Sequence, residues 1–136
     1  MKSKSTLTIA LLTLMFLGFG MVSFTVTQQQ PKPWTVPQEF KTMKNPVKAD
    51  AESVQVGKNL YMKMCASCHG KTGKGDGPKA RTLDTYSGDF TSAEFKNQAD
   101  GELFYKTKMG RGDMPKYENK IPDEDIWNLV NYMKSL

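Results

Sequence analysis

The sequence predicts a small all-α domain of three to five short helices, preceded by an N-terminal hydrophobic helix. Apolar side chains in residues 50–136 recur at helical spacing, and no segment alternates apolar and polar residues as a strand does. The chain of 136 residues has a one-domain length. Its region from 50 to 136 spans only 87 residues, a size at which an unaided apolar core is marginal. We therefore expect a further group to fill the centre of this domain.

Residues 1–27 are predicted to be a signal peptide or a signal-anchor transmembrane helix. Lys2 and Lys4 give a positive start, and residues 6–26 are 21 uncharged, mostly apolar residues. At about 1.5 Å per residue, a helix of this length spans about 30 Å, the thickness of a bilayer core. The run exceeds the ~7–15 apolar residues of a cleaved signal peptide, which favours a retained anchor. The positive start predicts an exported protein on the periplasmic side, anchored to the cytoplasmic membrane by its N-terminus.

Residues 28–49 are predicted to be a Pro-rich linker. Four of the seven prolines lie here, and proline favours extended spacers of about 3.1 Å per residue. Trp34, Val36 and Phe40 are too apolar for a purely solvated tether. They either pack on the neighbouring domain or dock a partner protein, and isolated surface aromatics are common enough to favour packing.

The domain at residues 50–136 begins with a helix from Ala51 to about Met64. Asp50 can cap this helix, because its carboxylate accepts hydrogen bonds from the free N–H groups of the first turn. Residues 70–90 then follow as a loop rich in glycine and lysine.

Three helical segments are expected beyond this loop. A short one covers residues 92–97, and Asp100 has the position of a cap for a helix running to about Lys108 and ended by Gly110. Pro122 suits the first position of the last helix, where its missing N–H costs nothing. The apolar stripe of that helix consists of Ile126, Leu129, Val130 and Met133.

Charge and rare residues exclude several classes of protein. The net charge is +5, and without residues 1–27 it is +3, from 17 basic and 14 acidic residues, too small for a nucleic-acid footprint. The chain has one histidine, His69, and two cysteines, Cys65 and Cys68. These three donors cannot complete a four-ligand zinc site, a bis-histidine iron site within one chain, or a disulfide framework.

Cys65, Cys68 and His69 form the attachment signature for c-type haem. Two cysteines three positions apart near a helix end can present both sulfurs to the two vinyl groups of one porphyrin edge. The next residue then ligates the iron through its imidazole. The alternatives are a redox dithiol, which would need a strand–helix context, and half of a zinc site, which lacks a second cysteine pair. We therefore expect one covalent haem c, bound by thioether bonds to Cys65 and Cys68, with His69 as the proximal axial ligand.

The sixth iron ligand can be a methionine, a lysine or an open position, since no second histidine exists. Beyond the linker, Met62 and Met64 lie beside the first cysteine and Met133 belongs to the terminal helix. Met109 and Met114 remain, both between the last two helices. Met114 is favoured because Pro115 follows it and restricts it to an extended backbone, whereas Met109 is expected to end its helix against the haem.

Residues 51–136 resemble a class I c-type cytochrome, most closely the small monohaem domains attached to bacterial respiratory complexes. Gly57 and Tyr61 resemble the contact pair on the first helix of that family, and Leu129 and Tyr132 resemble their partners on the terminal helix. Glycine is required where two helix backbones cross closely. The resemblance implies a small cytochrome c fold of three to five helices wrapped around one covalent haem.

Two loop motifs extend the resemblance. Pro78 resembles the proline whose carbonyl accepts the Nδ1–H of the proximal histidine and so orients His69. Residues 112–115, Gly-Asp-Met-Pro, resemble the distal loop that supplies the sixth ligand. The long N-terminal segment and the Lys/Gly-rich stretch at 70–81 depart from the family pattern.

The expected function is electron transfer by a His/Met-ligated haem, as an exported carrier or a small subunit in a respiratory chain. The alternative is a haem enzyme or a gas or peroxide sensor with a labile sixth ligand. Redox proteins, above all a membrane respiratory complex, are the expected partners; nucleic acid and small-molecule substrates are not. Residues 58–81 hold six basic residues and one acid, and residues 104–120 hold five and two. These segments are either a docking surface or a solvated face.

Overall fold

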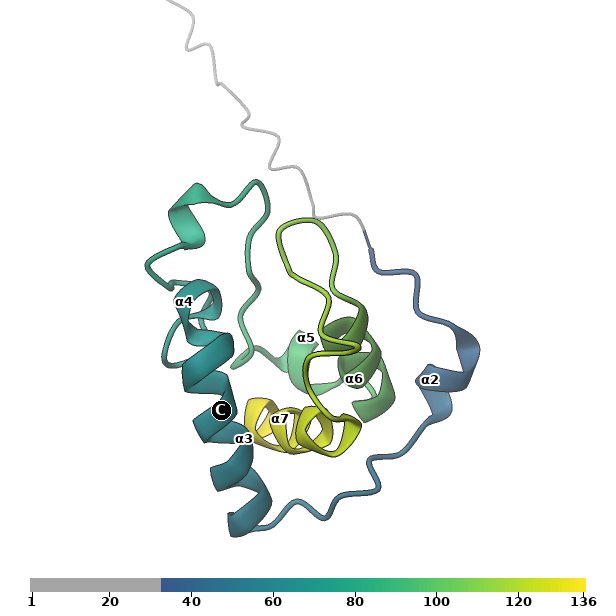
Figure 1. Ribbon diagram of the computed structural model, residues 1–136. Coiled ribbons are helices and arrows are strands. Elements are labelled where there is room, and N and C mark those ends of the chain that lie inside the picture. The colour runs from purple at the N-terminus through teal and green to yellow at the C-terminus, as the bar shows by residue number, and fades with distance from the viewer. Residues whose placement is uncertain (1–32) are drawn as a thin grey trace, which may run out of the picture. The chain divides into compact units, whose positions relative to one another are not determined.

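The computed structural model describes residues 33–136, so the N-terminal segment predicted at 1–27 lies outside the described residues. The described chain forms helices and no strand, which confirms the all-α prediction for this part. No helix within it is long and apolar enough to cross a membrane. Figure 1 shows the elements in chain order: α2 Gln38–Thr42, α3 Ala51–Met64, α4 Ala66–His69, the 3₁₀ turn η1 Ala80–Thr82, α5 Ala93–Lys96, α6 Asp100–Met109 and α7 Asp123–Ser135.

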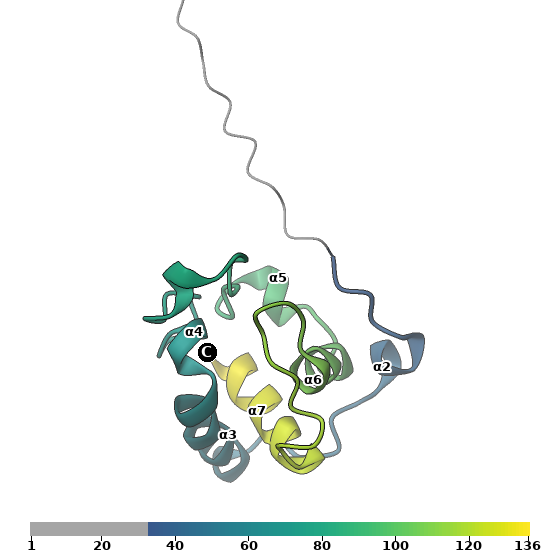
Figure 2. The same ribbon diagram turned by 45° about the horizontal axis from the view of Figure 1, so that its top comes forward.

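Helices α3 and α7 form the main packing contact of the domain and lie side by side in Figures 1 and 2. They meet at Gly57, where an added Cβ would overlap the backbone carbonyl oxygen of Asn128 and lie 2.9 Å from Tyr132 Cβ. One turn further along α3, the rings of Tyr61 and Tyr132 are 5.1 Å apart. Leu129 is fully buried. The helix pair predicted from the sequence is therefore confirmed.

Replacing Gly57 by alanine is expected to destabilise the domain, because the new methyl group forces the α3 and α7 backbones apart. Overpacking of this kind costs about 1–3 kcal/mol, and each 1 kcal/mol shifts the midpoint of a small domain by roughly 4–8 °C. Circular dichroism of the whole protein during heating measures this shift. Lys58→Ala, at an exposed position of the same helix, is the control, and equal midpoints for the two variants would contradict the close crossing.

Residues 33–49, expected to form most of the linker, pack on the domain over much of their length. Helix α2 lies against α6, where the Phe40 ring is 4.8 Å from the Tyr105 ring, and Val36 is buried. Further along, Asn45 donates a 2.8 Å hydrogen bond to Asn131 Oδ1 on α7. Of the two roles expected for these apolar residues, packing on the domain or docking a partner, the structure shows packing for Val36 and Phe40.

The start of α6 differs by one residue from the prediction that Asp100 caps it. Ala99 is the residue before the helix, and its N–H donates to the Glu102 carboxylate at 3.1 Å. Asp100 is instead the first helical residue, and its carboxylate pairs with Lys134 of α7 at 2.7 Å. The side chain predicted to cap α6 therefore joins α6 to α7.

The start of α7 also differs by one residue. Pro122 precedes the helix with an extended backbone, and Asp123 is its first residue. The predicted apolar stripe, in contrast, is confirmed, since all of its members are buried: Ile126, Leu129, Val130 and Met133.

Candidate functional site

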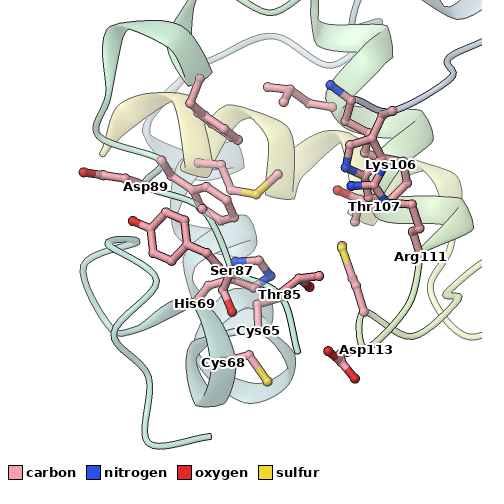
Figure 3. A pocket seen from close by; sticks show the side chains of 18 of the residues that line it. Cys65, Cys68, His69, Thr85, Ser87, Asp89, Lys106, Thr107, Arg111 and Asp113 are labelled. Carbon is pink, nitrogen blue, oxygen red and sulfur yellow. The ribbon is translucent and has the colours of Figure 1, made fainter. Parts of the chain in front are cut away.

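A cavity of about 690 Å³ lies between α3, α4 and α7 on one side and α6 with its following loop on the other. This volume is in the range of ~300–1,000 Å³ that is typical of cofactor sites. Figure 3 shows Cys65, Cys68 and His69 together on one wall and Lys106, Thr107 and Arg111 on another. Most of the remaining lining is apolar and includes Leu83, Phe90, Phe95, Leu103, Leu129 and Met133.

The Cys-x-x-Cys-His segment lies where α3 ends and the four-residue α4 begins. Cys65 donates its N–H to the Tyr61 carbonyl at 2.8 Å, and His69 donates its N–H to the Cys65 carbonyl at 3.0 Å. Gly70 ends α4 with φ +81°, and the Tyr61 hydroxyl donates to its carbonyl at 2.7 Å. These contacts fix the backbone of a segment in which Cys65, Cys68 and His69 all line the cavity.

The Cys65 thiol lacks the lowered pKa that is typical of a redox dithiol. Neither cysteine is in a disulfide, and burial, with a smaller contribution from Cys68, raises the pKa of Cys65 to about 12. Catalytic dithiols need the opposite, a lowered pKa that yields thiolate at neutral pH. Among residues 33–136, no three Cys, His, Asp or Glu side chains gather as a metal cluster of the zinc type.

His69 presents a buried imidazole suited to metal ligation. Its Nδ1 is buried without a hydrogen-bond partner in the described chain, and its ring lies 4.6 Å from the Phe90 ring. Burial lowers the pKa of His69, with the backbone of Ser87 acting in the opposite direction. A neutral imidazole is the form that binds metals, through one ring nitrogen while the other N–H donates to a protein acceptor. The residues present therefore fit a haem.

Pro78 is held beside the haem-binding motif by the residues that flank it. Gly77 donates its N–H to the Cys68 carbonyl at 3.2 Å, and Lys79 donates its N–H to the Ser67 carbonyl at 2.9 Å. The predicted hydrogen bond from His69 Nδ1 to the Pro78 carbonyl is not formed in this structure, since that nitrogen is unpaired. Pro78 itself is exposed.

The structure brings Met114, and not Met109, into the same cavity as His69. Met114 lies in the loop after α6, where its N–H donates to the Arg111 carbonyl at 3.0 Å and its carbonyl accepts from the Arg111 N–H at 2.9 Å. Gly112 forms this tight turn with φ +56°. Met109 ends α6 and lines a smaller, separate pocket of about 280 Å³.

Sequence reasoning missed several residues of the cavity wall. Phe90 packs its ring on that of His69 and, at 4.4 Å, on that of Phe95. Lys106 is half-buried and bonds to the Gln98 side chain, and burial lowers its pKa. Trp34 reaches the cavity from outside the helical domain. Phe90 and Phe95, at the end of the glycine-rich loop and just beyond it, were a usable signal, because large apolar side chains are usually buried. The apolar character of Trp34 indicated packing or docking but not its place at the cavity, and Lys106 gave no signal.

Two known proteins resemble this chain over part of their length. Cytochrome c550 from Pseudomonas aeruginosa is 28% identical over 93 residues, which cover 62% of this chain and 56% of that protein. Quinohemoprotein alcohol dehydrogenase ADH IIB from Pseudomonas putida is 28% identical over 109 residues, 79% of this chain and 14% of that enzyme. The chain thus spans about half, or much less, of these curated relatives.

A solved structure shares the fold. The chain aligns with one chain of the Kuenenia stuttgartiensis reducing HAO-like protein complex with a TM-score of 0.61 and 24% identity. The alignment covers 79% of this chain and 51% of the other.

The family of cytochrome c oxidase, cbb3-type, subunit III, matches residues 52–133. This range contains the Cys-x-x-Cys-His motif, the α3–α7 crossing and the loop that carries Met114. It also exceeds half of the chain. The chain therefore belongs to this family and contains a class I c-type cytochrome domain.

Proposed function

We propose that this chain transfers electrons through one covalently attached haem c. The observation that carries the proposal is that Cys65, Cys68, His69 and Met114 line one cavity, and we propose the two cysteines as attachment points and His69 and Met114 as axial ligands. Membership of a c-type cytochrome family supports haem as the cofactor. When bound, haem c supplies a one-electron redox centre, and His/Met ligation gives that centre a raised reduction potential.

The chain's own residues attach, orient and shield this cofactor. Cys65 and Cys68 form the thioether bonds, His69 is the proximal ligand and Met114 the distal one. Phe90 packs on the His69 ring and helps to keep water from it. The Pro78 carbonyl is the proposed acceptor for the His69 Nδ1–H, because its neighbours already bond to the backbone of the motif.

A haem enzyme or a gas or peroxide sensor is the alternative function. Two backbone hydrogen bonds close the turn that carries Met114, which favours a stably occupied sixth position. His69 is the single histidine of the chain, and its use as an iron ligand leaves no histidine to act as a general base. Both observations favour electron transfer over catalysis.

We propose a redox protein as the partner, with the chain acting as an exported carrier or as a small subunit of a membrane respiratory complex. The family to which residues 52–133 belong is named for an oxidase subunit, and a matching relative is a cytochrome c550. Export to the periplasmic side, with an anchor at residues 6–26, follows from the sequence of that segment.

The partner surface is proposed to be acidic. Six of the seven charged residues at 58–81 are basic, and so are five of seven at 104–120. The first segment contains the haem-attachment motif and the second contains Met114, so both lie next to the cavity. Complementary charge raises the rate of association and makes it sensitive to salt.

Stopped-flow oxidation of the reduced holoprotein tests this charge. We expect the rate with anionic ferricyanide to fall, by about tenfold, as ionic strength rises from ~0.01 to ~1 M and the Debye length shrinks from roughly 30 to 3 Å. A cationic cobalt complex should show the opposite trend. Lys74→Glu should lower the ferricyanide rate more than Lys41→Glu, a matched exposed control on α2. Rates independent of salt would contradict the proposed docking surface.

A further inference from the structure

Trp34 lies 18 residues before the family match at 52–133, yet it lines the same cavity as Met114. Pro33 lines the cavity too. The segment that matches the family, residues 52–133, therefore does not contain all of the residues that line the cavity.

Arg111 joins this segment to the distal loop. Its guanidinium lies over the Trp34 ring, 4.3 Å from the ring centroid, and its Nη1 donates to the Pro33 carbonyl at 3.1 Å. The backbone of the same residue forms both hydrogen bonds to Met114. Trp34 thus contacts the residue whose N–H and carbonyl fix the backbone of the proposed distal ligand.

The loop depends on such contacts, because its tip is not packed. A Cβ added at Gly112 would have no atom within 4 Å. Arg111 joins the loop to Trp34 and Pro33, and Asp113 joins it to Asp84, whose N–H donates to the Asp113 carboxylate at 3.0 Å. Losing the contact with Trp34 would weaken the attachment of the loop on its Arg111 side.

The position of Trp34 is itself well determined. Two residues further along, Val36 is buried, and α2 packs against α6, the helix that leads into the distal loop. Trp34 is therefore fixed relative to the start of that loop by contacts that do not involve Arg111.

We propose that Trp34 is a positioning residue that, through Arg111, holds the loop at 110–115 closed over the cavity, keeping Met114 in place and external ligands out. This inference rests on the proposed function, in which Met114 is the distal ligand. It gives the segment before the cytochrome domain a role in the chemistry of the haem site.

The test compares Trp34→Ala, Trp34→Phe and Tyr86→Ala in the oxidised holoprotein, with imidazole as the competing ligand. Tyr86 also lines the cavity, but its hydroxyl donates to the Lys74 carbonyl at 3.0 Å and the residue is 63% exposed. Arg111 is exposed and Trp34 half-buried, and a cation–π contact at an exposed site corresponds to a change of roughly two- to fivefold in an equilibrium. We therefore expect Trp34→Ala to bind imidazole about three- to fivefold more tightly, whereas Trp34→Phe and Tyr86→Ala stay within about twofold of the unsubstituted protein.

Amide hydrogen exchange at Met114 provides a second readout that does not depend on any added ligand. Its N–H is bonded to the Arg111 carbonyl, so its exchange should be faster in Trp34→Ala and restored in Trp34→Phe. Unchanged exchange and unchanged imidazole affinity in Trp34→Ala would overturn the positioning role.

The two proposals can fail separately. If the unsubstituted protein binds imidazole as tightly as a Met114→Ala variant does, His/Met ligation is wrong, and the exchange rate at Met114 still decides whether Trp34 holds the loop. If Met114→Ala binds imidazole more tightly than the unsubstituted protein but Trp34→Ala matches the unsubstituted protein in both measurements, ligation by Met114 stands and the role of Trp34 is wrong.

Discussion

Replacing Met114 by alanine is expected to open the sixth position to carbon monoxide in the reduced protein while leaving the haem attached. Met114 is the methionine of the distal loop that lines the cavity with His69. If the Met114-bound form makes up about 99% of the unsubstituted protein, removing that competitor raises the apparent affinity for carbon monoxide about 100-fold. Titration of the reduced variant with carbon monoxide, followed by absorption, measures the change. The reduction potential should fall as well, because methionine ligation raises it.

Met109→Ala is the matched control for this substitution. Met109 lies five residues earlier and lines a different, smaller pocket, so its loss should leave the affinity for carbon monoxide and the reduction potential unchanged. If Met109→Ala binds carbon monoxide and Met114→Ala does not, the distal ligand is Met109, and the loop at 110–115 has another role.

Replacing both Cys65 and Cys68 by alanine is expected to abolish covalent haem and to destabilise the domain. Mass spectrometry of the denatured protein should then give the mass of the polypeptide alone. The centre of the domain is a cavity of about 690 Å³, and a domain this small has little core besides what fills it. An unfilled cavity of this size in the core costs several kcal/mol, so the midpoint of thermal unfolding should fall by at least about 10 °C.

Ser67→Ala is the control within the same motif. The Ser67 side chain lies between the two cysteines in sequence, and its Oγ is 3.8 Å from Cys68 Sγ, but it offers no sulfur to the cofactor. This variant should keep both the haem mass and the unfolding midpoint. Haem that stays on the double-cysteine variant after denaturation would contradict attachment through Cys65 and Cys68.

The α3–α7 pair could be predicted from the sequence because its signals are local. Asp50 caps α3 through the Ser53 N–H, and the apolar stripe of α7 follows the helical period. The glycine at the helix crossing, Gly57, is a residue type that this geometry requires. A helix cap, a periodic stripe and a glycine all act within a few residues, which is the range over which sequence patterns are informative.

The Cys-x-x-Cys-His motif belongs to the same class of signal, since three donors within five positions point to one cofactor. The preference for Met114 over Met109 rested on the local effect of Pro115. Met114 is the one of the two that lines the cavity with His69.

The features that sequence reasoning missed depend on contacts between distant residues. Asp100 is acidic at a helix start, but whether it caps α6 was decided by Lys134, 34 residues away. Trp34 reaches Arg111 across 77 positions, and Asn45 bonds to Asn131 across 86. No local pattern encodes these partners, because they meet only after the helices have packed. The prolines at 31–46 suggested an extended spacer, and tertiary packing of Val36 and Phe40 outweighed that tendency.

The absorption spectrum of the full-length protein, made in cells with c-type haem maturation, tests the central claim most directly. The spectrum is recorded for the oxidised protein, the reduced protein and the reduced protein with carbon monoxide. With His69 and Met114 both bound to iron, the spectra should be those of low-spin haem, and carbon monoxide should leave the reduced spectrum unchanged. A large shift on adding carbon monoxide would contradict a closed sixth position and favour gas or peroxide chemistry, and a protein without haem would contradict the site altogether.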